Sequence, residues 1–499
     1  MSLFSFRINS QKLKDIFWPI KKSEVSLFLP LGLMMMCVLF NFGALRSIKD
    51  SLVVPNIGAE VISFLKLWLV LPSTIIFTLI YVKLSNIFSY DKLFYIIVSS
   101  FLLFFFVFTY FLFPEQDYFH PSSTTIDRAI ELYPNLKWFI KIAGKWSYAV
   151  MYVFCELWSA VVINLLFWQY ANHIFDTDSA KRFYPFLGMI GNLGLVLAGN
   201  VLVSFSDLSG SDTNIGAFAT DISYQCEMVL KPIINTIIFS GIIAMILYRF
   251  IDHYVLKSSG FIRMAENTKT SLSFVDSIKL ILRSRYIGHI VVLVLCYGLL
   301  INILEGPWKS KVSQLYPNTI DYINFMGKFN IWMGISCVTF MIIGSNIIRN
   351  FTWTTAALVT PMMIATTGLI FFSFVLVGRY FDFTDALINP IYAAVLIGAI
   401  QNILSKATKY SLFDSTKEMA YIPLSIELKT KGKAAVEVIG LKFGKSLGAF
   451  IQSSIFIIAP IASFDSVISY LLVIFIIVVL LWTWNVKALG RQYSNIISK

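Results

Sequence analysis

Seven charged side chains interrupt stretches of the sequence that are otherwise apolar. They are Arg46, Lys49, Lys66, Glu156, Glu305, Lys442 and Lys445. A charge at the centre of a membrane-spanning helix costs about 2.5 to 3.5 kcal/mol on insertion scales, so each one needs an ionic partner or a water-filled cavity. These positions therefore indicate where a charged solute would bind or cross a membrane.

Arg46 and Lys49 are the pair best suited to a polyphosphate. They are three residues apart in the sequence and so share one helix face. Arg offers planar paired donors to phosphate oxygens and Lys adds a compact charge, so together they can bind several oxygens at once. Alternatively, both snorkel to lipid headgroups from a helix end, as we expect of Lys66 early in the next span.

Glu156 and Glu305 are the acidic residues of this set. Glu156 has apolar residues on both sides in the sequence, which leaves it no nearby water. It could pair with a cation of the first span, carry a proton, or form a purely structural ion pair. The same alternatives hold for Glu305, for which Lys309 at i+4 is a local partner.

The stretch around Lys445 looks like a phosphate-binding P-loop but fails its spacing. A P-loop has four residues between its glycines and follows a strand in a soluble domain, whereas Gly440 and Gly444 are separated by three residues within an apolar segment. Gly440, Gly444 and Gly448 instead predict a smooth helix face for close packing. Lys445 beside that face is expected to point inward.

The composition places the chain in a bilayer. Hydrophobic residues make up 57% of 499 residues, the mean hydropathy is +0.74, and charged residues make up 14%. The net charge of +12 fits the enrichment of Lys and Arg in cytoplasmic loops, so we expect no nucleic-acid partner. The five Cys and four His are scattered, and we expect no metal and no cofactor. The N-terminal segment lacks a signal-peptide pattern, so the first span should direct insertion.

Apolar runs long enough to cross a bilayer recur about twelve times. They lie near residues 27–47, 60–82, 92–113, 146–170, 183–205, 229–249, 288–308, 323–347, 353–377, 386–405, 434–458 and 466–486. The prediction is an all-α integral membrane protein, with one half at 1–249, a cytoplasmic linker at 250–287 and a second half at 288–499. Lys and Arg are about three times as frequent on one side, which predicts that both termini are cytoplasmic.

Two six-helix halves joined by a basic loop are typical of major facilitator transporters, in which the substrate binds between the halves. The first helix of each half is expected to end in charge, at Arg46 to Asp50 and at Glu305 to Lys311. By analogy with that fold, Gln401 and Asn402 on the tenth span line the cavity.

Nine segments, in order along both halves, resemble the non-mitochondrial ATP/ADP translocases of obligate intracellular bacteria and plastids. They are Leu45 to Asp50, Glu156 to Trp158, Phe167 to Asn172, Ala180 to Tyr184, Glu305 to Lys311, Gln401 to Lys406, Lys409 to Asp414, Met419 to Leu424 and Gly444 to Ser446. The resemblance implies antiport of nucleotides in the bacterial inner membrane and a need for Lys49, Glu156, Glu305 and Lys445. Ser159 and Leu447 depart from the family pattern, which leaves the base preference open.

The expected function is therefore antiport of external ATP against internal ADP by alternating access, not catalysis. Arg46, Lys49 and Lys445 would bind the phosphates, with Glu156 and Glu305 as gating or coupling residues. An empty site holding several cations would be costly to dehydrate, which favours exchange over net movement. The alternative is proton-coupled net import of other nucleotides (GTP, CTP or UTP). A membrane enzyme or nucleotide receptor is a third class. No obligatory protein partner is evident from the sequence.

Overall fold

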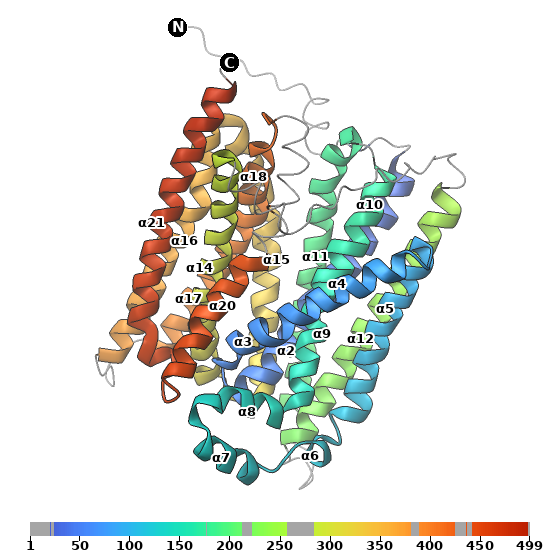
Figure 1. Ribbon diagram of the computed structural model, residues 1–499. Coiled ribbons are helices and arrows are strands. Elements are labelled where there is room, and N and C mark those ends of the chain that lie inside the picture. The colour runs from blue at the N-terminus through green and yellow to red at the C-terminus, as the bar shows by residue number, and fades with distance from the viewer. Residues whose placement is uncertain are drawn as a thin grey trace.

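The computed structural model describes residue 20 and residues 24–175, 177–211, 222–256, 284–380, 389–424, 436 and 442–497. Throughout these ranges the regular structure is helical. Figure 1 shows long helices side by side. We call the end where α2 begins and α21 finishes the proximal face, and the opposite end, which carries α6, α7 and α8, the distal face (Figure 1).

The first six spans lie between Val25 and Leu256. Several are built from an α-helix joined to a π-helical segment (η). In order, the elements are α2 (Val25–Ile57), α3 (Val61–Phe64), η2 (Leu65–Val70), α4 (Leu71–Ser85), α5 (Tyr90–Val107), η3 (Phe108–Leu112), α9 (Trp146–Trp158), η5 (Ser159–Phe167), α10 (Trp168–Ile174), α11 (Thr177–Ser211), α12 (Ile222–Phe250) and η7 (Ile251–Leu256). The distal connection holds α6 (Gln116–Phe119), α7 (Ser123–Leu132), the 3₁₀ turn η4 (Pro134–Leu136) and α8 (Lys137–Gly144).

The remaining spans lie between Arg285 and Ile497. Their elements are α14 (Arg285–Leu315), α15 (Thr319–Asn350), α16 (Trp353–Tyr380), α17 (Pro390–Thr408), η8 (Lys409–Phe413), α18 (Asp414–Ala420), α20 (Lys442–Ile458) and α21 (Phe464–Ile497). Within the described residues, eleven spans are long and apolar enough to cross a membrane, and Gly444–Ile458 of α20 is a shorter apolar helix. The all-α membrane prediction is confirmed.

The predicted linker falls mostly outside the described residues. η7 reaches Leu256 and α14 begins at Arg285, so residues 257–283 are not among those described. The division into halves at 1–249 and 288–499 therefore stays a prediction.

The first helix of each half does not end at its charged residues, and that part of the prediction is wrong. α2 continues to Ile57 and α14 to Leu315. Hydropathy falls at Arg46 and at Glu305 because charges enter, but partners on other helices satisfy those charges and the backbone stays helical. α2 ends where Gly58 adopts a φ of +123°, a conformation that glycine tolerates and side chains resist.

Several contacts join the first and second groups of spans at the distal face, and one is the hydrogen bond that Asn324 donates to Asp207 over 2.6 Å. Asn56 donates to the Thr319 hydroxyl over 3.2 Å, and a Glu60 carboxylate oxygen accepts from the Phe464 backbone N–H over 3.1 Å. The rings of Trp138 and Phe456 lie 6.3 Å apart. α20 packs on α3, η2 and η4 there, whereas α4 leans away toward the proximal face (Figure 1). The distal face is thus the side held closed.

Candidate functional site

A cluster of charged side chains lies where α2, η2, α9 and α14 meet. We call it the ionic cluster, and its members are the cations Arg46, Lys49, Lys66 and Lys309 and the carboxylates Asp50, Glu156 and Glu305. Four cations face three carboxylates, so one positive charge is in excess. Such a cluster inside apolar helices is the expected mark of a pathway for a charged solute.

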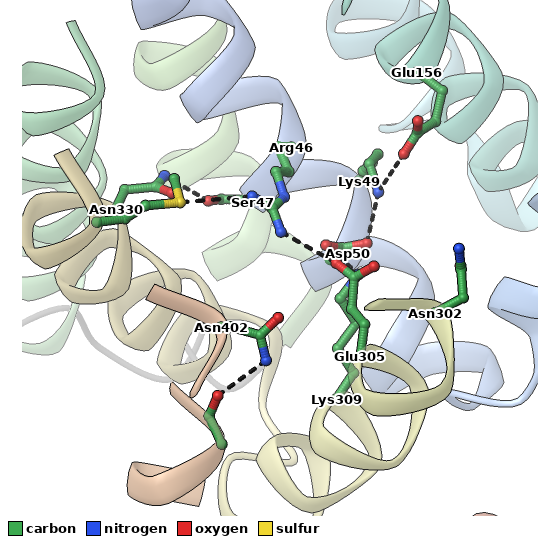
Figure 2. Close-up of polar contacts among 12 residues, drawn as sticks. Arg46, Ser47, Lys49, Asp50, Glu156, Asn302, Glu305, Lys309, Asn330 and Asn402 are labelled. Atoms are coloured by element: carbon green, nitrogen blue, oxygen red, sulfur yellow. Dashed lines mark hydrogen bonds and ion pairs between the residues drawn. The ribbon is translucent and has the colours of Figure 1, made fainter. Parts of the chain in front are cut away.

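Glu305 is the acceptor that binds the most cations. One carboxylate oxygen lies 3.1 Å from Arg46 Nη2 and 3.2 Å from Lys309 Nζ, and the other lies 2.9 Å from Lys66 Nζ. Figure 2 shows Arg46 approaching Glu305 from the opposite side to Lys309. Lys66 therefore does not snorkel to headgroups, and that prediction is wrong.

The contacts of Lys49 lie within the first group of spans, between α2 and α9. Its ammonium lies 2.8 Å from Asp50 Oδ1 and 3.0 Å from Glu156 Oε1, and 4.0 Å above the Tyr152 ring centroid. Glu156 is therefore paired with a cation of the first span (Figure 2), a contact that fits both a gating pair and a purely structural ion pair. Neither Arg46 nor Lys49 snorkels from a helix end.

Exposure is uneven across the cluster, with Lys49 4% and Arg46 10% exposed. The side chains of Asp50 and Lys309 are 0% and 1% exposed, those of Glu305 and Lys66 11% and 15%, and that of Glu156 27%. A solute would therefore first meet the Glu156 and Lys66 side, while Asp50 and Lys309 form the closed floor.

Amides and an aromatic ring surround the charges. Asn302 accepts from Lys66 over 2.9 Å, and Asn330 donates to Ser47 over 2.9 Å. Arg46 also lies 5.9 Å from the Phe329 ring centroid. These contacts fix the orientation of the charged side chains. Side chains that are already held in place lose less conformational freedom when they bind a ligand.

Lys445 is exposed and forms no salt bridge within the part of the chain that the structure describes. It lies on α20, which packs against α14 and η2, the elements that carry Glu305 and Lys66. The glycine prediction explains its position: a Cβ on Gly444 would lie 3.1 Å from the Leu295 carbonyl oxygen, and one on Gly448 would lie 2.7 Å from Asn302 Cβ. α20 and α14 therefore pack closely, while Gly440 is outside the described residues.

Gln401 and Asn402 are each 1% exposed, on α17. Asn402 donates to the Gly398 carbonyl of its own helix over 2.9 Å (Figure 2). The Nε2 of Gln401 has no partner within the described structure. In this conformation both amides are covered by neighbouring side chains, so a role in lining the pathway stays a prediction.

Asp50 is the member of the ionic cluster that the sequence reasoning missed, whereas Lys309 was expected only as the i+4 partner of Glu305, a contact that the structure has at 3.2 Å. Both were assigned to helix ends, yet they are buried and 2.8 Å apart. The signal for Asp50 was its i+4 spacing from Arg46, which matches the spacing of Lys309 from Glu305. Complementary charges at helical spacing favour a helix that continues.

Comparison with known proteins decides the family. The family model described as the TLC ATP/ADP transporter matches residues 5–493. The chain belongs to this family. The chain is 61% identical over 502 residues to ADP,ATP carrier protein 3 of Rickettsia conorii, with 98% of this chain and 99% of that protein covered. It is 44% identical to ADP,ATP carrier protein 1 of Rickettsia prowazekii, with 98% and 97% covered.

Solved structures of other transporters share the fold of this TLC family member. A bacterial homologue of the iron transporter ferroportin, in an inward-facing state, matches with a TM-score of 0.54 at 14% identity, covering 94% of this chain and 99% of that one. The xylose transporter XylE matches with a TM-score of 0.51 at 13% identity, covering 96% and 97%. These matches confirm the prediction of a major-facilitator-like fold.

Proposed function

We propose that this TLC family member is a nucleotide antiporter that takes up ATP in exchange for ADP by alternating access. Its place would be the bacterial inner membrane, with the proximal face and both termini toward the cytoplasm. Family membership, the names of the two ADP,ATP carriers from Rickettsia and the uneven distribution of Lys and Arg support this proposal.

The observation that carries the proposal is the pairing of Arg46 with Glu305 and of Lys49 with Glu156, at 3.1 Å and 3.0 Å. Each cation has a counter-ion that a phosphate oxygen can replace. Phosphate binds Arg and Lys through the same charge-assisted hydrogen bonds as carboxylate. Substrate entering from the Glu156 side would take over these cations, and exposed Lys445 would add a further one.

A preference for exchange follows from charge. Without substrate the ionic cluster has one positive charge in excess, and Lys445 nearby adds another. Passing through a closed, dehydrated state with unneutralised cations is costly. A bound polyphosphate neutralises them, so the carrier should change sides mainly when loaded.

The test is uptake of labelled ATP into proteoliposomes preloaded with ADP, with another nucleotide, or with buffer alone. The proposal expects uptake against internal ADP or ATP and almost none into vesicles loaded with buffer. Equal uptake into buffer-loaded vesicles, dependent on pH, would instead indicate proton-coupled import. If ATP is not transported but GTP, CTP or UTP is exchanged, antiport stands and its substrate is corrected.

A paired set of variants connects the transport assay with the site. Lys49→Gln removes a cation that a phosphate would bind, whereas Lys311→Gln removes one that pairs with half-exposed Asp465 away from the ionic cluster. We expect exchange to fall sharply in the first variant and to stay near wild type in the second. Normal exchange by Lys49→Gln protein that is correctly inserted would contradict the phosphate-binding role.

A further inference from the structure

α8, on the distal face, carries lysines in a row. Lys137 and Lys141 are four residues apart, so their side chains follow one helix face, and Lys145 caps the helix directly after its last residue, Gly144. If the distal face is extracytoplasmic, this is the side on which Lys and Arg are normally sparse. The usual enrichment of basic residues on the cytoplasmic side therefore does not explain three lysines within nine residues there.

None of these lysines forms a salt bridge among the residues that the structure describes. Lys141 donates only to the Ile57 carbonyl at the end of α2, over 3.4 Å. Partial burial is the main cause that lowers the pKa of Lys141, and the positive charge of Lys137 lowers it further. The negative charges of Glu60 and Asp127 raise this pKa in part, without forming an ion pair with Lys141. Among the described residues, no carboxylate therefore forms a direct ion pair with the lysines of α8.

Trp138 stands between two of the lysines and at the closed seam. Lys137 Nζ lies 4.9 Å and Lys141 Nζ 5.2 Å from its ring centroid, so cations flank the indole. On another side the indole meets the Phe456 ring of α20 at 6.3 Å. Trp138 is 5% exposed, and its N–H has no hydrogen-bond partner within the described structure.

These features lie at the distal end of the pathway. Lys141 contacts the last residue of α2, the helix that carries Arg46 and Lys49. When the distal face opens, α20 must separate from α3 and η4, and Phe456 then leaves Trp138. The side of the indole that Phe456 contacts would then become free, beside the two ammonium groups and at the mouth of the route to the ionic cluster.

We propose that Lys137, Trp138 and Lys141 form a capture site for nucleotide on the distal face. The two lysines bind the polyphosphate, and the base replaces the Phe456 ring against Trp138. The site rests on the proposed function and adds to it a first binding step specific to one side. Aromatic stacking suits any base, so base selection would not occur here.

The experiment measures ATP exchange from each side separately, in proteoliposomes whose orientation is established by protease access to a C-terminal tag. In the double variant K137Q/K141Q, the KM for ATP added at the distal face should rise roughly three- to tenfold, the range for partly exposed charged contacts. The KM at the proximal face and the kcat should not change. Rates from the distal face should also lose much of their dependence on ionic strength.

The matched control is Arg128→Gln on α7, which removes the same charge from an exposed position of the same connection. It should leave both KM values unchanged. At Trp138, Phe should preserve the distal KM because an aromatic face remains, and Leu should raise it. A KM unchanged in the double variant, or raised equally on both sides, overturns the capture site. An effect confined to vesicles of anionic lipid would assign the lysines to lipid headgroups and also overturn it.

A second measurement separates this proposal from the proposed function. Asn135 is exposed in η4, two residues before α8 begins, and Asn135→Cys can be labelled with a membrane-impermeant maleimide. ATP should slow the labelling, and K137Q/K141Q should abolish that protection. Protection without transport would contradict antiport but keep the capture site, whereas transport without protection would do the reverse.

Discussion

Lys309 Nζ lies 2.8 Å from Asp50 Oδ2, and both side chains are almost fully buried. This pair joins α2 to α14 beneath the more exposed charges of the ionic cluster. Removing Asp50 leaves Lys309 buried and charged with only Glu305, at 3.2 Å, as an ionic partner among the described residues, and breaking a buried ion pair typically costs about 3 to 5 kcal/mol. We therefore expect Asp50→Asn to lower the melting temperature of the purified protein markedly, as measured by its unfolding in detergent.

The double variant D50N/K309Q tests the pairing itself. Because it removes both charges, its loss of stability should be smaller than the sum of the two single losses. Lys311→Gln is the control, since its pair with half-exposed Asp465 is expected to contribute no more than about 1 kcal/mol. A double variant as unstable as the sum would refute a direct interaction.

Glu156 offers a prediction about affinity and turnover. If its carboxylate competes with phosphate for Lys49, Glu156→Gln should bind nucleotide more readily but release it more slowly. Initial rates over a range of ATP concentrations should then show a lower KM together with a lower kcat. A raised KM would show instead that Glu156 helps to bind the substrate, which contradicts the exchange of counter-ions.

Lys445 should affect transport without affecting stability. The side chain is exposed and has no salt bridge among the described residues, so Lys445→Gln leaves no buried charge behind. A charge-assisted bond to phosphate is worth about 1.5 to 3 kcal/mol, so exchange should fall roughly ten- to hundredfold at an unchanged melting temperature. Lys92→Gln, at an exposed position in the first turn of α5, should retain exchange. Full activity in Lys445→Gln would remove Lys445 from the site.

Gly298 sets the distance between α14 and α20. A Cβ there would lie 2.9 Å from the carbonyl carbon of Gly444 and 3.0 Å from Lys445 N. Gly298→Ala should therefore push the helices apart, at a cost of about 1 to 3 kcal/mol, and displace Lys445. We expect lower stability and slower exchange. Gly188→Ala is the control, because its Cβ would meet only the end of Met341 at 3.5 Å, and equal losses in both variants would exclude this explanation.

The cost of burying charge was enough to select most of the ionic cluster from the sequence. Arg46, Lys49, Glu156 and Glu305 all stand in apolar surroundings, and all four belong to it. The same argument found Lys66 but expected it to snorkel, because its partners Asn302 and Glu305 are more than 230 residues away in the sequence. A single sequence carries no information about which distant helices meet.

Helix ends were predicted poorly where a helix continues past its charged residues, as α2 and α14 do. A fall in hydropathy at Asp50 and at Lys309 predicts that the helix leaves the membrane there. The two charges instead form an ion pair, which offsets the free energy of burying each of them. The small-residue face at Gly444 and Gly448 was predictable because its requirement is local and steric. The distal seam at Glu60, Trp138 and Phe464 gave no such signal, since it depends on how the two groups of spans are oriented.

That seam leads to the last prediction, which concerns Glu60. Its carboxylate accepts from the backbone N–H of Phe464, the first residue of α21, and the first N–H groups of a helix have no acceptor within the helix itself. Glu60→Ala should weaken the closed distal face and shift the carrier toward a distal-open state. Glu60→Gln keeps an acceptor oxygen and should shift it much less.

The measurement is labelling of Ala59→Cys, a buried position beside the seam, by an impermeant maleimide added at the distal face. The background should be low because the native cysteines are buried. Labelling should be faster in the Glu60→Ala background than in Glu60→Gln or the parent, and equal rates in all three would mean that this bond does not help to hold the distal face closed.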